Sequence, residues 1–185
     1  SDAIGDALLD LANTTSDRLL SKYALIVAAH ACSAGIQQKM SNLVNIPEAR
    51  WIRLDALDAL ANADEVAPAI VDQLTLSFIL RAPPILAVPA THLVAAHAPV
   101  AKALDLFEGI ANSNNRRALL LVAATAMAPR DRAVAGRILD LLEPGHPARE
   151  LLGVTAPLAL SILDDLGTVE LRDHVRKYLG DRLVS

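Results

Sequence analysis

The chain has 185 residues, a formal net charge of −4 and a hydrophobic content of 53%, with only 3% aromatic residues. This length favours a single domain with a sizeable core. The negative charge argues against a general affinity for nucleic acid phosphates, and the longest uncharged runs are shorter than the roughly 20 apolar residues that a membrane span requires. A core of Leu, Ala, Val and Ile suits closely packed helices, and the alternation typical of strands is absent, so we predict an all-α domain over 1–185.

The first quarter of the chain predicts three helices. A short acidic helix covers 3–12, and a longer one covers 18–34, with capping residues at 15–17 before it and Gly35 after it. A linking helix over 36–44 follows. The single cysteine, Cys32, cannot form an internal disulfide, and its apolar surroundings indicate a buried thiol in a reducing compartment, which favours a cytoplasmic protein. The opening Ser1-Asp2-Ala3 is typical of a cut or processed end, so we expect a piece of a larger protein.

The middle of the chain predicts a helix pair. The first helix carries Trp51 and further apolar residues at steps of three and four, and it ends at Asn62. The second begins near Asp64, has Pro68 in its first turn and stops before Pro83. We favour a position for Trp51 in the core or between helices, with an exposed binding position as the alternative.

The second half of the chain predicts a proline-punctuated stretch and then further helices. A short helix is expected near 90–97 and a clear one over 100–111, closed by a turn at 112–115. The most apolar helix, over 116–127, should be central. The remaining predicted helices cover 133–142, 148–152, 156–166 and 169–179.

A short sequence motif recurs along the chain. Leu60-Ala61-Asn62 has near-copies at 11–13 and at 110–112, which are offset by 49 and 50 residues. Each copy ends a predicted helix and is followed by another, which indicates repeat units at 1–45, 46–95, 96–145 and 146–185. The alternative is an irregular compact bundle whose helices end alike for capping reasons.

Several polar turns have an acidic or amide residue followed within two positions by arginine; they are Asp17-Arg18, Asn115-Arg116-Arg117, Asp131-Arg132 and Glu170-Leu171-Arg172. With these turns, the helix pairs and their coarse period resemble the HEAT and armadillo repeats. The resemblance covers most of the chain, although the central pair has Val66-Ala67 where an arginine is expected and the period exceeds the usual ~40–47 residues. It implies a short α-solenoid of stacked antiparallel helix pairs that binds proteins or peptides.

No catalytic or metal-binding pattern is visible in the sequence. The eight glycines never fall as Gly-x-Gly, so phosphate-binding loops are not encoded. His92 and His97 are turned about 140° apart on a helix, which makes them poor co-ligands. Glu170 and His174 share a helix face, but the Glu-x-x-His pattern of carboxylate-bridged metal sites is missing. We therefore expect no enzymatic activity, no metal and no cofactor.

Clustered arginines are the strongest candidate binding residues. Arginine recognises carboxylates and phosphates bidentately, so the cluster suggests an acidic peptide as partner, whereas the alternative is a solvated flank of an apolar helix. We predict a non-enzymatic scaffold that binds a protein or peptide. A small-molecule sensor with an apolar pocket is the second possibility, and an enzyme that depends on a missing domain is the third. The candidate binding residues are Arg116, Arg117, Arg130, Arg132, Arg137 and Trp51.

Overall fold

A computed structural model describes residues 2–31, 33–44, 50–113 and 116–141. Every regular element in these ranges is an α-helix, which confirms the all-α prediction. The chain divides into two compact units, Ser1–Thr75 and Leu76–Ser185, called here the N-terminal unit and the C-terminal unit. The helices predicted after 142 lie outside the described residues, as do Cys32 and the pair Glu170 and His174.

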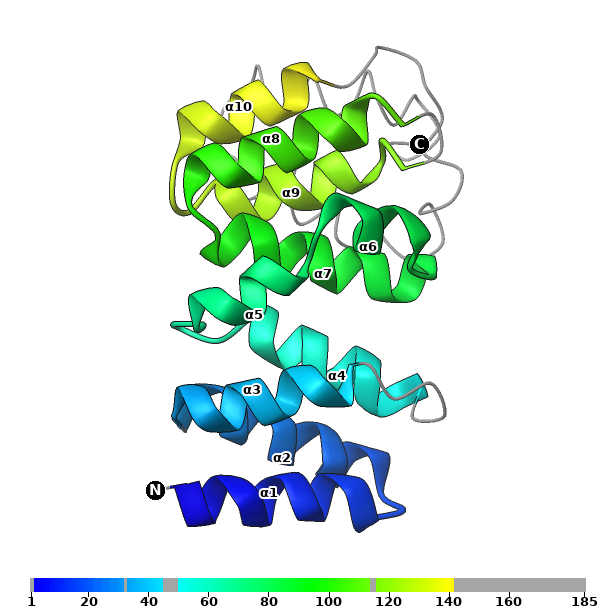
Figure 1. Ribbon diagram of the computed structural model, residues 1–185, viewed down its shortest axis with the longest axis vertical. Coiled ribbons are helices and arrows are strands. Elements are labelled where there is room, and N and C mark those ends of the chain that lie inside the picture. Colours follow the sequence, from blue (N-terminus) through cyan, green and yellow to red (C-terminus); the bar gives the residue numbers. More distant parts are fainter. Residues whose placement is uncertain (1, 32, 45–49, 114–115, 142–185) are drawn as a thin grey trace, which may run out of the picture. The chain divides into compact units, whose positions relative to one another are not determined.

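The N-terminal unit is built from helices that pack on helices one or two places away in the sequence. Helix α1 runs in the opposite direction to α2 and packs mainly on it, while α2 also contacts α3 and α4 (Figure 1). Helix α3 contacts α1, α4 and α5. The described helices of this unit are α1 (Asp2–Thr14), α2 (Arg18–Ala31), α3 (Ala34–Leu43), α4 (Arg50–Ala61) and α5 (Pro68–Gln73).

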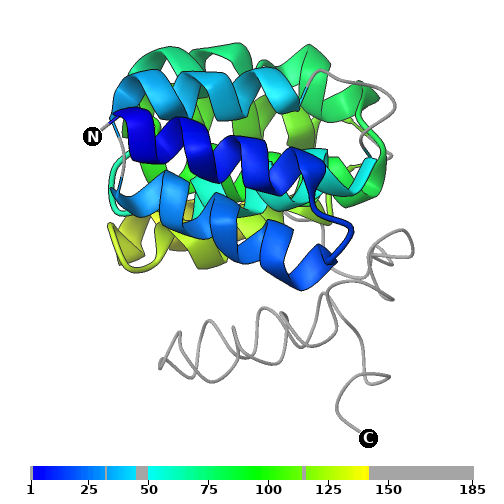
Figure 2. The same cartoon turned by 90° about the horizontal axis from the view of Figure 1, so that it is seen from below.

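The turn between α1 and α2 shows why these two helices form a hairpin. The Asp17 carboxylate accepts hydrogen bonds from the backbone N–H groups of Leu19 at 2.9 Å and Leu20 at 3.2 Å, as the capping prediction requires. The buried Ser21 hydroxyl donates to the carbonyl oxygen of Ala12 at 2.9 Å and thereby joins the end of α1 to the start of α2. Seen from below, α1 and α2 lie side by side (Figure 2).

The boundary between α2 and α3 differs from the prediction. Helix α2 ends at Ala31 instead of residue 34, and Gly35 does not end it but lies in the first turn of α3. Ser33 is the extended residue that precedes α3, so the chain reverses direction two residues earlier than the glycine suggested. Buried Ile36 and Met40 then face the core, which indicates that packing of α3 decided the boundary.

The C-terminal unit is organised around α9, which confirms that the most apolar helix is central within this unit. Helix α9 contacts α7, α8 and α10, and almost all of its residues are buried. It begins at Leu119, three residues later than predicted. The described helices of this unit are α6 (Leu76–Arg81), α7 (Pro84–His97), α8 (Val100–Ala111), α9 (Leu119–Met127) and α10 (Arg132–Asp140).

Two predictions in the middle of the chain are wrong. The expected single helix after Asp64 is two short ones, α5 and α6, because Leu74 leaves the helical conformation at ψ 73°. Conversely, the expected short helix near 90–97 is the longer α7, which contains Pro89. An internal proline costs about 3 kcal/mol in a helix. Burial of Leu86, Ala90 and Leu93 along α7 offsets that cost.

Candidate functional site

Three of the five candidate arginines bind backbone carbonyls of the C-terminal unit. Arg116 Nη2 donates to the carbonyl of Ala82 at 2.7 Å, just after α6. Arg117 Nε donates to the carbonyl of Ala111 at 2.6 Å, at the end of α8. The last carbonyls of a helix have no intrahelical partner, so both side chains act as caps.

Arg130 makes the same kind of contact at the end of α7. Its Nη1 donates to the carbonyl of Ala95 at 2.6 Å and its Nη2 to that of Ala98 at 3.0 Å. Arg132 and Arg137 are both exposed on α10. Three of the arginines therefore bond helix ends, and Arg130 among them is exposed as Arg132 and Arg137 are. This division argues against one acidic-peptide site formed by all five.

Trp51 lies at the surface of the N-terminal unit and not in the core. Its side chain is 50% exposed, and the Arg18 guanidinium lies over the indole ring, 4.1 Å from its centroid. Arg18 Nε is also 3.7 Å from Oδ2 of the buried Asp55. Beside this pair, Lys22 Nζ is 3.3 Å from Asp58 Oδ2. The flank of α2 that faces α4 is thus held by two ion pairs.

The adjoining face of α2 is apolar and exposed. At 100° per residue, its four large side chains fall within an arc of about 100°. Each of them is at least 44% exposed. We call this set the α2 face; it consists of Leu19, Leu20, Tyr23 and Val27.

Exposed hydrophobic side chains are concentrated in one part of the chain. Among the described residues, all seven large hydrophobic residues that are exposed lie in the N-terminal unit. Besides the α2 face, they are Ile4 and Leu11 on α1 and Trp51 on α4. A contiguous exposed apolar surface marks an interaction site, and among these seven residues the four of the α2 face share one side of a helix.

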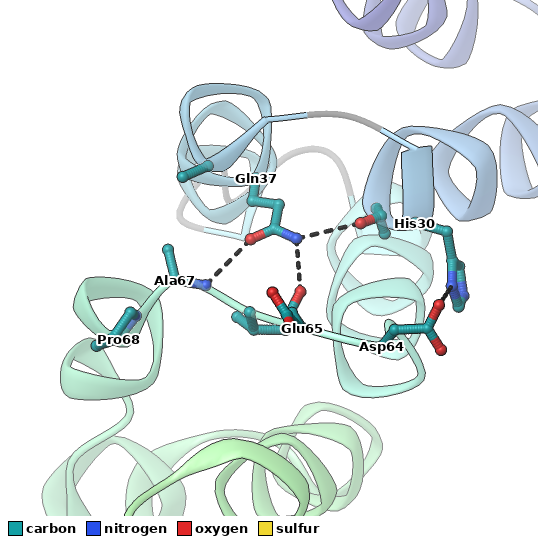
Figure 3. Close-up of a pocket in the computed structure, with 9 residues that line it drawn as sticks. His30, Gln37, Asp64, Glu65, Ala67 and Pro68 are labelled. Carbon is teal, nitrogen blue, oxygen red and sulfur yellow. Dashed lines mark hydrogen bonds and ion pairs between the residues drawn. The ribbon is translucent and has the colours of Figure 1, made fainter.

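A cleft opens at the C-terminal end of α2, where it is lined by residues of α2, α3 and the segment that leads into α5. Its volume is about 460 Å³, within the range of ligand pockets. The side chains of His30 and Asp64 lie next to each other at one edge of it, with 3.8 Å between Nδ1 and Oδ2 (Figure 3). Glu65 is exposed at the same place. We call this hollow the Asp64 cleft.

Gln37 holds one wall of the Asp64 cleft in place. Its buried amide Nε2 donates to the carbonyls of Ala29 at 3.1 Å and Glu65 at 2.8 Å, and its Oε1 accepts from the backbone N–H of Ala67 at 3.1 Å (Figure 3). One side chain therefore ties the end of α2 to the segment that carries both carboxylates. Sequence reasoning passed over Gln37, because a lone glutamine on a helix gives no signal of partners 30 residues away.

Two further features of the described residues concern other kinds of site. Within them, no group of three or more His, Cys, Asp or Glu side chains is placed to hold a metal ion. The helices of the described ranges also include none that is long and apolar enough to cross a bilayer.

Comparisons with known proteins give no match. No protein-family model, no curated protein and no solved structure matches the chain.

Proposed function

We propose that this chain is a non-enzymatic protein-binding module that contacts its partner through the α2 face. The observation that carries the proposal is the concentration of exposed Leu19, Leu20, Tyr23 and Val27 on one side of one helix. Burying one such side chain completely lowers the free energy by about 1.5–3 kcal/mol. Their exposure is therefore costly unless another surface covers them.

The free energy gained by burying the α2 face limits how tightly this face alone can bind a partner. The four side chains are already about half covered, so completing their burial supplies roughly 3–6 kcal/mol in total. Association itself costs 4 kcal/mol or more in lost freedom of motion. Contact with the α2 face alone gives weak binding, and a specific partner requires further contacts at the edges of that face.

The recurring motif around Leu60-Ala61-Asn62 supports the second part of this proposal, a scaffold of stacked helix pairs. The three near-copies lie at the ends of α1, α4 and α8. At the end of α4, the Asn62 side chain donates to the carbonyl of Asp58 at 2.7 Å, a capping role that suits a recurring asparagine. A short α-solenoid of the HEAT and armadillo kind exposes an extended surface for a protein or peptide.

The alternatives receive less support from these contacts. The walls of the Asp64 cleft carry carboxylates and a histidine, which suit a charged group and not the lipophilic ligand expected of a sensor with an apolar pocket. An acidic partner on the arginines would depend on Arg132 and Arg137, since Arg116 and Arg130 are held by backbone carbonyls.

An unbiased selection tests this proposal. Small helical binders are selected from a naive displayed library against the wild-type chain, and their Kd values are measured against Tyr23→Ser and Val27→Ser. We expect most binders to lose at least tenfold affinity, because binders converge on apolar anchor positions. Ile4→Ser is the matched control, since Ile4 is 61% exposed on α1. Binders that lose affinity equally on Ile4→Ser, or that ignore Tyr23 and Val27, would contradict the assignment to α2.

A further inference from the structure

We infer that the partner of the α2 face is an amphipathic helix with lysine or arginine at one end, and that this basic end enters the Asp64 cleft. The inference rests on the proposed function, because it names the chemistry of the partner that covers the same surface. Three features support it: the face is continuous with the cleft, negative charge surrounds the cleft, and Gln37 fixes the cleft wall.

The α2 face leads directly to the cleft. Tyr23, Val27 and His30 follow one another at steps of four and three residues, so they lie on one side of α2. His30 also lines the Asp64 cleft. From Leu19 to His30 the helix advances about 16 Å at 1.5 Å per residue. A partner helix of three to four turns laid along α2 would therefore reach the cleft with its last turn.

The charge at this end of α2 is negative. The Asp64 side chain is 94% exposed and Glu65 is exposed beside it, so both carboxylates are open to a partner. The carbonyl end of α2 adds a partial negative charge. The basic group that faces these carboxylates from α2 is His30, which is 35% exposed. A lysine or arginine side chain is the group that complements this set.

Basic side chains lie at the opposite end of α2, and they set the orientation of the partner. Arg18 and Lys22 lie there and are paired with Asp55 and Asp58, so a second basic group is not favoured at that end. The net charge of the whole N-terminal unit also favours a basic partner. Residues 1–75 contain ten acidic and five basic residues, a net charge of −5, whereas the whole chain has −4.

The acidic wall is held in position before a partner arrives. Gln37 bonds the backbone at Glu65 and at Ala67, and it also bonds the carbonyl of Ala29 at the end of α2. The two carboxylates therefore project from a braced segment. Pre-positioned groups bind with a smaller loss of conformational freedom.

Three stapled helical peptides test the inference. They share one apolar stripe and a length of about 16 residues, enough to run alongside α2, and they differ only in two terminal residues, which are Lys, Gln or Glu. Binding to the full chain is followed by NMR shifts of backbone amides. A spin label at the variable end reports which part of α2 lies nearest to it.

We expect the lysine-ended peptide to bind about three- to tenfold more tightly than the glutamine-ended one, since two partly exposed charge pairs have that effect. The glutamate-ended peptide should bind most weakly. The spin label should broaden the amide of His30 and not that of Leu19. The double variant Asp64→Asn, Glu65→Gln should remove the preference for lysine. The charge-matched control, Asp105→Asn with Glu108→Gln on the exposed side of α8, should keep it.

Other outcomes separate this inference from the proposed function. If the three peptides bind alike and only Tyr23→Ser weakens them, the basic end is overturned and the α2 face stands. A lysine preference that survives Asp64→Asn, Glu65→Gln would reveal general attraction to an acidic unit and overturn the cleft. Absence of shifts in α2 at millimolar peptide would overturn both proposals. A wild-type dimer that becomes monomeric on Tyr23→Ser would assign the face to a second copy and overturn the helical partner.

Discussion

Gln37 offers the sharpest test of how the N-terminal unit holds its cleft. The substitution Gln37→Met preserves the length of the side chain and removes its amide. Three hydrogen bonds are lost, to Ala29, Glu65 and Ala67. Each such bond contributes about 0.5–1.5 kcal/mol net, so we expect the free energy of unfolding to fall by roughly 1.5–4.5 kcal/mol.

The assay combines chemical denaturation with hydrogen exchange. Exchange is needed because two units can unfold separately, and it assigns the change to a segment. The amide of Ala67 should lose protection first, since its acceptor is Gln37 Oε1. Gln38→Met is the matched control, because the Gln38 amide donates to the Ser41 hydroxyl at 2.9 Å and, among the described residues, bonds no other segment. Equal losses of stability in the two variants would refute the bracing role of Gln37.

Three further predictions concern stability elsewhere in the chain. Arg130→Met should lower the free energy of unfolding by about 1–3 kcal/mol, because it removes two hydrogen bonds to the end of α7. In the same thermal melt, Arg132→Ala should change it by no more than about 0.5 kcal/mol, because Arg132 is exposed. Similar changes in the two variants would refute the capping role of Arg130. Gly136→Ala should raise stability by about 0.5–1 kcal/mol, since a Cβ there meets nothing within 4 Å in the middle of α10, and a lower melting temperature would contradict this. Arg18→Met should shift the fluorescence of the only tryptophan to the red, because Arg18 lies over its ring. It should also lower the free energy of unfolding by about 1–2 kcal/mol, because the buried Asp55 loses its partner. Lys22→Met, which removes one partner of an exposed ion pair, should have neither effect.

Local rules were enough to find most helices. The hydrophobic spacing and the Asp17 cap predicted the α1–α2 hairpin, because both depend on residues within four positions. The same rules failed where packing outweighed local preference. Pro89 is accommodated inside α7 because that helix is buried, and Gly35 lies within α3, where buried Ile36 and Met40 face the core.

The candidate site shows where sequence reasoning ends. The arginines drew attention because charge is visible in sequence, yet Arg116 and Arg130 find their carbonyls 34 and 35 residues away. Trp51 was expected in the core or between helices, with an exposed position as the alternative; it lies beside Arg18 of α2, and half of it is exposed. The sequence of α2 is apolar on more than one side, and it gives no indication of which side the neighbouring helices leave open.

The amino-acid sequence by itself determined that this protein is helical, where most of its helices run and that its largest helix faces would be apolar, since these depend on the spacing of side chains along the chain. Tertiary structure alone decided which apolar side chains remained uncovered and which polar groups met. Helices α1, α3 and α4 cover the other sides of α2 and leave Tyr23 and Val27 to solvent. Such contacts depend on where distant helices pack, and spacing along one helix does not contain that information.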